Sequence, residues 1–382
     1  MWYLSGEINP RTTMKTILLL LVLCPFALTA QTTRTTVMAG DFYNPAIWSP
    51  VGFPASGDQL YINHAVVLNL DIYYNAGQIT INPGGSLVQD AGQRSVWIDG
   101  GGLTNNGTFS THFVWVSNGG YLTNTWDFTG IDSLMVQADF TNSGTAGIND
   151  FWVMIGGNVS NSGTLTNTDS MFVQGIFTNT GIAGIYDLAF DEMASLNNSG
   201  SLNVSNNMHN QGYLYNSYTI EVANDFSNCN TQNFNAVFEN DGIVCFGNDF
   251  LNCDTDTITG SGDYFVGNLS SNLGVFSGNQ TFHTPTGALT VNLGTVQPSV
   301  TMTTGACSAG MDELSDEWSV FPNPTVDWVS LSQGEVEYAI YSITGELEMN
   351  GVAEDGRLDV RNLKSGVHIL RVNNSAIRMV KL

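Results

Sequence analysis

The sequence predicts an all-β protein, in which a right-handed parallel β-helix (a β-solenoid) is followed by a small C-terminal β-sandwich. One motif recurs along the chain: an apolar residue, any residue, Asn, and then often any residue and Gly. Runs rich in aromatic and β-branched residues, such as 113–116 and 151–154, lie between the copies. The 41 glycines and the scarcity of Lys and Glu in the middle of the chain disfavour helices.

The spacing of the repeat fits one solenoid coil per copy. The asparagines of the first copies follow one another at nearly constant intervals: Asn105, Asn124, Asn142, Asn161, Asn179 and Asn198. We expect them to form a turn ladder, because a corner needs positive φ, which Gly supplies and Asn tolerates, and stacked amides can bond along the ladder. Weaker copies continue, partly in shorter steps, at Asn210, Asn228, Asn240 and Asn252.

The pattern divides the chain into four segments. Residues 1–30 read as a leader and signal peptide, because Met14-Lys15 precedes an apolar run and small residues suited to cleavage. Residues 31–294 are the expected solenoid, with an N-terminal cap over residues 40–58 that protects its open end. Residues 295–318 read as a linker and residues 319–382 as the sandwich. No stretch approaches the roughly 20 apolar residues of a transmembrane segment.

The charge balance restricts the partners. The chain has 10 basic and 34 acidic residues, and no Lys or Arg lies between Arg94 and Arg357. A surface without cations cannot neutralise phosphates, so nucleic acid and anionic lipid are poor partners for this region, and we expect no nucleic acid to bind. The same gap argues against a polysaccharide lyase, which needs a cationic group at the uronate. Acidity that keeps an exported protein soluble is the simplest explanation.

The last segment carries specific motifs. They are the opening Phe321-Pro322-Asn323-Pro324, the turn residues Gly345 and Gly366, and a basic end that includes Lys381. In these motifs residues 319–382 resemble the type A C-terminal sorting domain of type IX secretion cargo from Bacteroidota. The resemblance implies export, recognition by the outer-membrane translocon, removal by a sorting protease, and a secreted or outer-membrane-attached product.

The repeats carry a second resemblance. Copies such as Leu103–Gly107, which read Leu-Thr-Asn-Asn-Gly, are similar over residues 100–260 to filamentous haemagglutinin-type adhesins. This resemblance implies an adhesive β-helix region.

Four aspartates at coil spacing form the main candidate for chemistry. Asp132, Asp150, Asp169 and Asp187 follow one another at the interval of the repeat and are expected to stack in a row. A turn ladder is the first interpretation, a weak Ca²⁺ site the second, and an acid/base pair of a glycosidase the third. We expect no other cofactor and no catalytic residue.

The aromatic and histidine residues of the rod give weaker signals. Trp97, Trp115, Trp126 and Trp152 can form a sugar-stacking strip, although stacking inside the solenoid is the favoured interpretation. The histidines are scattered without metal-site spacing.

The cysteines after the leader permit two disulfides. They are Cys229, Cys245, Cys253 and Cys307. If each of the short repeat steps were one coil, Cys229 and Cys253 would lie about 10 Å apart, beyond the roughly 7 Å reach of a disulfide. They can pair only if the whole interval is one wide coil. Cys245 with Cys253 is the alternative.

These observations predict a non-enzymatic, secreted or surface-displayed rod that contacts a glycan, a matrix or a host surface. A secreted glycosidase-like enzyme on the same scaffold is the alternative. A third hypothesis, a mere spacer, would be supported by the absence of an exposed aromatic strip.

Overall fold

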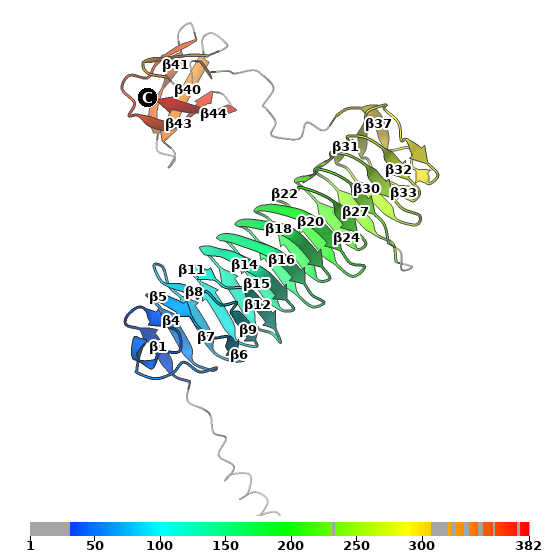
Figure 1. Ribbon diagram of the computed structural model, residues 1–382. Helices are drawn as coiled ribbons and strands as arrows, with labels where there is room; N and C mark the ends of the chain where they lie inside the picture. Colours follow the sequence, from blue (N-terminus) through cyan, green and yellow to red (C-terminus); the bar gives the residue numbers. More distant parts are fainter. Residues whose placement is uncertain are drawn as a thin grey trace, which may run out of the picture. The chain divides into compact units, whose positions relative to one another are not determined.

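A computed structural model describes residues 31–230, 234–306, 320–321, 325–331, 336–342, 347–353, 356–372 and 375–381. The chain divides into two compact units, residues 1–307 and residues 308–382. The predicted leader and signal peptide lie outside the described residues. The all-β prediction is confirmed: the first unit is a parallel β-solenoid of about 13 coils (Figure 1).

One sheet runs along the whole rod and has 15 strands. In spatial order its strands are β3 (Trp48–Ser49), β1 (Thr33–Thr36), β4 (Gln59–Ile62), β7 (Gln78–Ile81), β10 (Gly102–Asn105), β13 (Tyr121–Asn124), β15 (Asp139–Asn142), β17 (Asn158–Asn161), β19 (Ile176–Asn179), β21 (Ser195–Asn198), β24 (Tyr213–Asn216), β27 (Val237–Asn240), β30 (Thr257–Gly260), β33 (Val275–Phe276) and β36 (Thr295–Val296).

A second, 22-stranded sheet closes the coils and consists of two bands. The first band contains β2 (Gly40–Asp41), β5 (Ala65–Leu68), β8 (Ser86–Gln89), β11 (Thr108–Ser110), β22 (Ser201–Val204), β25 (Thr219–Val222), β28 (Ile243–Phe246), β31 (Asp263–Val266), β34 (Thr281–Thr284) and β37 (Thr301–Thr304). The second band contains β6 (Ile72–Tyr74), β9 (Ser95–Asp99), β12 (Phe113–Ser117), β23 (Met208–Asn210), β26 (Phe226–Asn228), β29 (Phe250–Asn252), β32 (Ser270–Asn272) and β35 (Val291–Asn292). Four long strands serve both bands: β14 (Asp127–Val136), β16 (Thr145–Val153), β18 (Thr164–Val173) and β20 (Ile182–Phe190).

The core is a set of buried columns with one member per coil. In strands of this kind alternate side chains point inward, so each short strand contributes one or two core residues. The coil that begins at β10 buries Leu103, Phe109 and Val114, for example. Adjacent coils are about 4.8 Å apart, and therefore equivalent side chains touch along the axis of the rod.

The first coil is capped at its open edge. Strand β3 pairs antiparallel with β1. It thereby occupies the edge at which a strand of another chain could add. The 3₁₀-helix η1 (Pro45–Ile47) leads into β3, and Trp48 is fully buried with its Nε1 donating to the Phe42 carbonyl at 2.9 Å. An ion pair between Arg34 and Asp58 at 3.0 Å ties the cap to the first coils.

The predicted start of the linker at residue 295 is wrong. Strands β36 and β37 pair in parallel with β33 and β34, so the solenoid continues through Thr304. The reason is that Val296, Val300 and Met302 still pack against the core, although the surrounding residues have a loop-like composition. The remainder of the predicted linker lies almost entirely outside the described residues.

The corner residues were predicted for the wrong reason. Among the described non-glycine residues positive φ occurs at Asn118 and Thr255, so the repeat asparagines have ordinary extended backbones. The repeat glycines are needed for close approach instead. A Cβ on Gly163 would lie 2.1 Å from the carbonyl oxygen of Gly144 in the preceding coil, which no side chain permits.

The second unit contains two small antiparallel sheets. One consists of β38 (Val320–Phe321), β39 (Trp328–Leu331) and β42 (Arg357–Asp359). The other has the order β41 (Leu347–Ala353), β40 (Val336–Ser342), β43 (Gly366–Val372) and β44 (Ser375–Lys381). Residues from both sheets, among them Val329, Leu358, Ile340 and Leu370, share one core.

Candidate functional site

The six predicted ladder asparagines occupy one buried row at the ends of the first-sheet strands. Each Nδ2 donates to the Oδ1 of the next coil's asparagine at 2.7–2.8 Å, from Asn105 through Asn198. Each Nδ2 also reaches a backbone carbonyl, such as that of Ile182 for Asn161. Asn216 and Asn240 extend the row. Because these amides are at most 1% exposed, they stabilise the coils and cannot contact a ligand.

The weaker copies belong largely to a different row. Asn210, Asn228, Asn252 and Asn272 form a second buried ladder, on the second band, with amide bonds of 2.7–2.9 Å. The short steps of the repeat therefore pass from one ladder to the other within a coil. Asn216 was missed because no Gly follows it, although its place one repeat interval after Asn198 identifies it.

The wide-coil condition for the cysteines is met. Asn228 pairs with Asn252, so the whole interval between them is a single coil. Cys229 and Cys253 follow these asparagines and form a disulfide with Cα atoms 4.9 Å apart. The alternative pairing of Cys253 with Cys245 is therefore wrong, and Cys307 lies outside the described residues.

The four predicted aspartates do not form one row. Asp150 is in register with Ser133 and Ser170, and Ser170 is in register with Asp187. Asp132 and Asp169 lie outside this register, because irregularities in β14 and β18 absorb the difference in length between neighbouring coils. The nearly equal spacing in sequence thus hides a change of register at the corner.

An aspartate and asparagine ladder does exist, but it begins at Asp187. The Oδ1 atoms of Asp187, Asn207, Asp225 and Asp249 each accept the backbone N–H of the equivalent residue in the next coil at 3.0–3.2 Å. These side-chain oxygens supply acceptors for backbone N–H groups at the irregular corner. In the described part of the chain, no group of three or more His, Cys, Asp or Glu side chains could hold a metal ion.

The favoured interpretation of the tryptophans, that they stack inside the solenoid, is wrong. The outward position of the second band forms a column, here called the aromatic column, whose members pair in register from coil to coil. Its members are Tyr73, Trp97, Trp115, Met135, Trp152, Phe172, Ala189 and His209. Tyr73 is 63% exposed, Trp115 37% and Trp152 39%. Trp126 lies elsewhere, on the corner between the first sheet and the first band.

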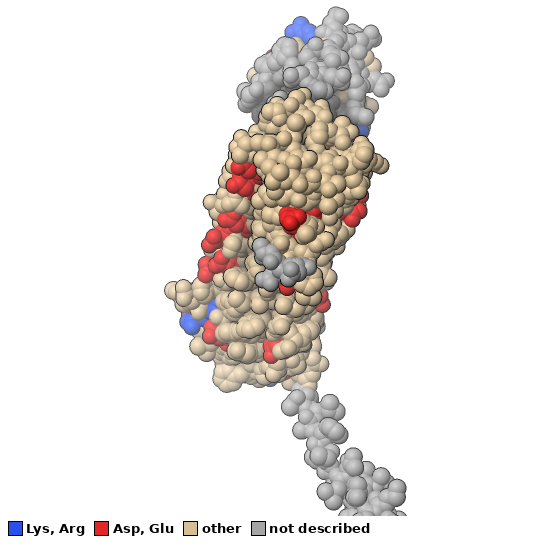
Figure 2. Space-filling model, turned by 90° about the vertical axis from the view of Figure 1, so that its right-hand side faces the viewer, with Lys and Arg blue, Asp and Glu red and all other residues tan. Residues whose placement is uncertain are grey.

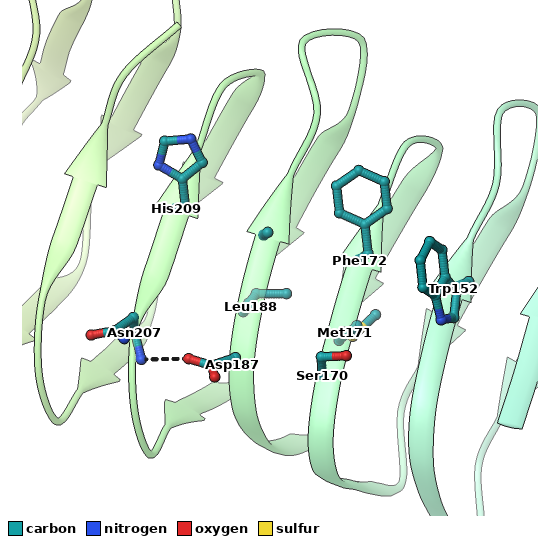
Figure 3. Close-up of a pocket in the computed structure, with 9 residues that line it drawn as sticks. Trp152, Ser170, Met171, Phe172, Asp187, Leu188, Asn207 and His209 are labelled. Carbon is teal, nitrogen blue, oxygen red and sulfur yellow. Dashed lines mark hydrogen bonds between the residues drawn. The ribbon is translucent and has the colours of Figure 1, made fainter. Parts of the chain in front are cut away.

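The rings of the column are partly stacked and leave two hollows. Tyr73 and Trp97 stack with centroids 4.5 Å apart, and Trp152 meets Phe172 edge to face at 5.7 Å. One hollow of about 240 Å³ lies among Tyr73, Trp97 and Trp115. A larger hollow of about 480 Å³ extends from Trp152 to His209 (Figure 3). The column thus offers both ring edges and recesses to a ligand.

A second outward column, here called the polar column, runs beside the aromatic one. It contains Ser133, Asp150, Ser170, Asp187 and Asn207, each two positions before a member of the aromatic column. Alternate residues share a face, so the two columns lie side by side, about 7 Å apart. In Figure 2 carboxylates are scattered along the visible rod, and Lys and Arg appear only near one end of it. From Ser133 to His209 the apolar rings and the hydrogen-bonding oxygens therefore form one surface, along a stretch of sequence that contains no Lys or Arg.

His209 ends the aromatic column and is held rigidly. Its Nδ1 lies 2.5 Å from Ser227 Oγ, and its Nε2 lies 2.8 Å from Gln211 Nε2. Burial lowers the pKa of His209 below the ordinary value of 6.5. Both observations fit a neutral imidazole, with Nε2 accepting a hydrogen bond from the amide and Nδ1–H donating to the hydroxyl.

The sorting-motif residues lie in the second unit. Phe321 is in β38, and Gly366 opens β43, where it pairs with Lys381 of β44. Lys381 is only 8% exposed. Pro322, Asn323, Pro324 and Gly345 lie outside the described residues. Arg357 and Arg361 both lie over the Trp328 ring, and bonds from Arg361 lower the pKa of Asp359 to about 2.

Comparison with known families identifies this second unit. Residues 319–382 match the model of the secretion system C-terminal sorting domain. The chain is exported cargo of the type IX secretion system. This cargo protein is accordingly secreted or placed on the cell surface, and its sorting domain interacts with the secretion machinery. No curated protein and no solved structure matches the chain. Within the described residues no helix has the length and apolar character needed to cross a membrane.

Proposed function

We propose that the solenoid is a non-enzymatic adhesive rod, which binds a glycan of a matrix or of another cell through the aromatic column. The observation that carries the proposal is the exposure of aromatic rings on consecutive coils, where folding alone would tolerate polar residues. Large exposed aromatic side chains in a linear array are typical of binding surfaces.

The chemistry of the two columns fits a sugar chain. A pyranose ring has an apolar face of C–H groups that packs on aromatic rings, and its hydroxyls bond to carboxylates, amides and hydroxyls. The aromatic column supplies the first contact and the polar column the second. The array is one residue wide and has one step per coil, which suits a linear polymer better than a broad protein interface.

The exposed column also argues against a mere spacer. A spacer needs coils that stack, and the inward columns and the asparagine ladders already provide this stacking. Exposed tryptophans add no comparable stability and carry a risk of aggregation.

One observation favours the enzyme alternative. Asp150 and Asp187 occupy the same register two coils apart, about 10 Å by the strand spacing, which is close to the separation in inverting glycosidases. Against a catalytic role, Asp187 Oδ1 accepts from Asn206 Nδ2 and from the Asn207 N–H, as a carboxylate that supports a corner does.

The test combines binding with turnover. The purified protein is applied to a glycan array and to insoluble polysaccharides, with Ca²⁺ and with a chelator, and released reducing sugar is measured. Binding without release, weakened in Trp97→Ala, is the expected result. Sugar release that is lost in Asp187→Asn would replace the adhesive proposal by the enzymatic one. Binding that requires Ca²⁺ would add a cation to the site.

A further inference from the structure

The aromatic column is interrupted at one place. From Tyr73 to His209 every member has a long side chain except Ala189, which lies between Phe172 and His209. Met135, at the corresponding position between Trp115 and Trp152, has a long and flexible side chain. The gap at Ala189 is therefore a local feature of this coil, and it coincides with the larger of the two hollows.

The gap has the dimensions of a slot for one ring. Phe172 and His209 are two coils apart, so their side chains start about 10 Å from each other. A flat ring placed midway would lie about 5 Å from each, which is the range in which ring systems pack. Figure 3 shows both rings projecting to the same side, on either side of the strand that carries Leu188.

The walls of the slot are fixed before a ligand arrives. The hydrogen bonds to Ser227 and Gln211 hold the His209 ring, and Phe172 packs edge to face with Trp152. The Asn207 N–H donates to Asp187 Oδ1 at 3.0 Å, which fixes the carboxylate at the edge of the hollow. Rigid walls reduce the entropy lost on binding.

The edge of the slot is polar and anionic. Ser170, Asp187 and Asn207 line the same hollow and lie on the polar column. These groups accept and donate hydrogen bonds in the manner that sugar hydroxyls require. No Lys or Arg occurs between residues 95 and 356, so nothing along this stretch of the sequence would neutralise a uronate or a sulfate.

We propose that the slot between Phe172 and His209 holds one uncharged pyranose ring of a linear glycan, with Ala189 as its floor and Asp187 at its hydroxyl edge. The proposal rests on the adhesive function above and specifies its ligand: a neutral chain that inserts one sugar ring between the two walls. Uronic-acid and sulfated chains are rejected, because their charge would meet Asp187.

The decisive variant fills the slot. Ala189→Phe places a ring between the two walls on the outer face, where it does not disturb the core. Ala189→Ser keeps the slot open, and Leu251→Phe adds a ring to the same outward position three coils beyond Ala189. Circular dichroism of each purified full-length variant establishes that it is folded.

The probes are a β-1,4-linked glucose hexasaccharide, the corresponding N-acetylglucosamine hexasaccharide and a galacturonic acid hexasaccharide, titrated by calorimetry. We expect a neutral probe to bind and the acidic one not to bind. Ala189→Phe should reduce the affinity for the neutral probe about tenfold or more, because the sugar loses its packing on two rings. Ala189→Ser and Leu251→Phe should retain the wild-type affinity.

The outcomes separate the two proposals. If Ala189→Phe and the wild type bind the neutral hexasaccharide with equal affinity while Trp97→Ala loses affinity, the slot proposal is overturned and the adhesive function stands. If no hexasaccharide binds but an insoluble polysaccharide binds in a way that depends on Trp97, the slot proposal is likewise overturned and the adhesive function stands. Absence of binding to any glycan overturns both. Binding of the galacturonic acid probe as tightly as a neutral one overturns the selection by charge.

Discussion

The coils up to Phe190 and the coils from Met208 onward share a backbone but differ at two adjacent positions of the second band. In the early coils the inward position is apolar, as at Val116 and Val153, and the outward position is aromatic except at Met135 and Ala189. In the later coils the inward position is Asn, as at Asn228, and the outward positions include Ser227 and Leu251. The fold therefore accepts either solution, and the aromatic column is dispensable for folding.

The inward difference is tolerated because both versions satisfy the interior. A valine column loses apolar surface from water, whereas an asparagine column pairs every amide with its neighbours. A single residue of one kind within the other kind of column satisfies neither condition. The predictions that follow use this contrast, from the largest expected effect to the smallest.

Asn228→Val should be the most damaging single change. It removes the side-chain acceptor of Asn210 Nδ2, which keeps only its backbone carbonyls, and it removes the ladder donor of Asn252 Oδ1, at a cost of about 2–4 kcal/mol of unfolding free energy. Denaturant unfolding followed by circular dichroism measures the loss. Leu251→Val, on the outward face of the next coil, is the control and should change stability by less than about 1 kcal/mol. Equal effects of the two variants would contradict the ladder's role.

Loss of the disulfide between Cys229 and Cys253 should destabilise the later coils by about 3 kcal/mol, because the bond closes a loop across a sequence separation of 24. The double variant Cys229→Ala/Cys253→Ala tests this in the same unfolding measurement. Hydrogen exchange should show the effect concentrated in β26 and β29 and little change in β9 and β12. A uniform effect on early and late coils would mean that the rod unfolds as one cooperative unit.

Trp152→Ala should reduce glycan affinity roughly tenfold while changing stability by less than about 1 kcal/mol, because its ring is on the surface. Leu251→Ala is the matched change in the later coils and should leave the affinity unaltered. Calorimetric titration and thermal unfolding of both proteins separate the two quantities. A loss of stability without a loss of affinity would assign Trp152 a structural role.

The smallest effect concerns pH. The folded-state pKa of His209 is lowered by burial, so the unfolded chain takes up its proton first. Stability should therefore fall as the pH drops from the ordinary value of 6.5 toward the folded pKa, and it should not fall further below that value. The His209→Gln variant should lack this dependence and His112→Gln should retain it. Ser227 and Gln211 contact the ring, and Ser170, Asp187 and Asn207 line the same hollow. An unchanged slope in His209→Gln would assign the dependence to other groups.

The fold was predictable because its signals are local. A periodic Asn, alternating apolar residues and a paucity of helix formers define a coil whatever surrounds it. The motifs of residues 319–382 identified the sorting domain in the same way. The position of the aspartates was not predictable, because irregularities at the corners moved Asp132 and Asp169 out of register with Asp150 and Asp187.

By itself the sequence determined the coil, the absence of Lys and Arg between residues 95 and 356, and the export route, since each depends on composition, period or a contiguous motif. Only the tertiary structure decided which residues of different coils meet. It separated two asparagine ladders that the sequence merges, and it placed Trp97, Trp115 and Trp152 outside the core with the gap at Ala189 among them. The physical reason is that side chains alternate between the faces of a strand, so one residue more or less in a corner decides whether a ring is buried or exposed.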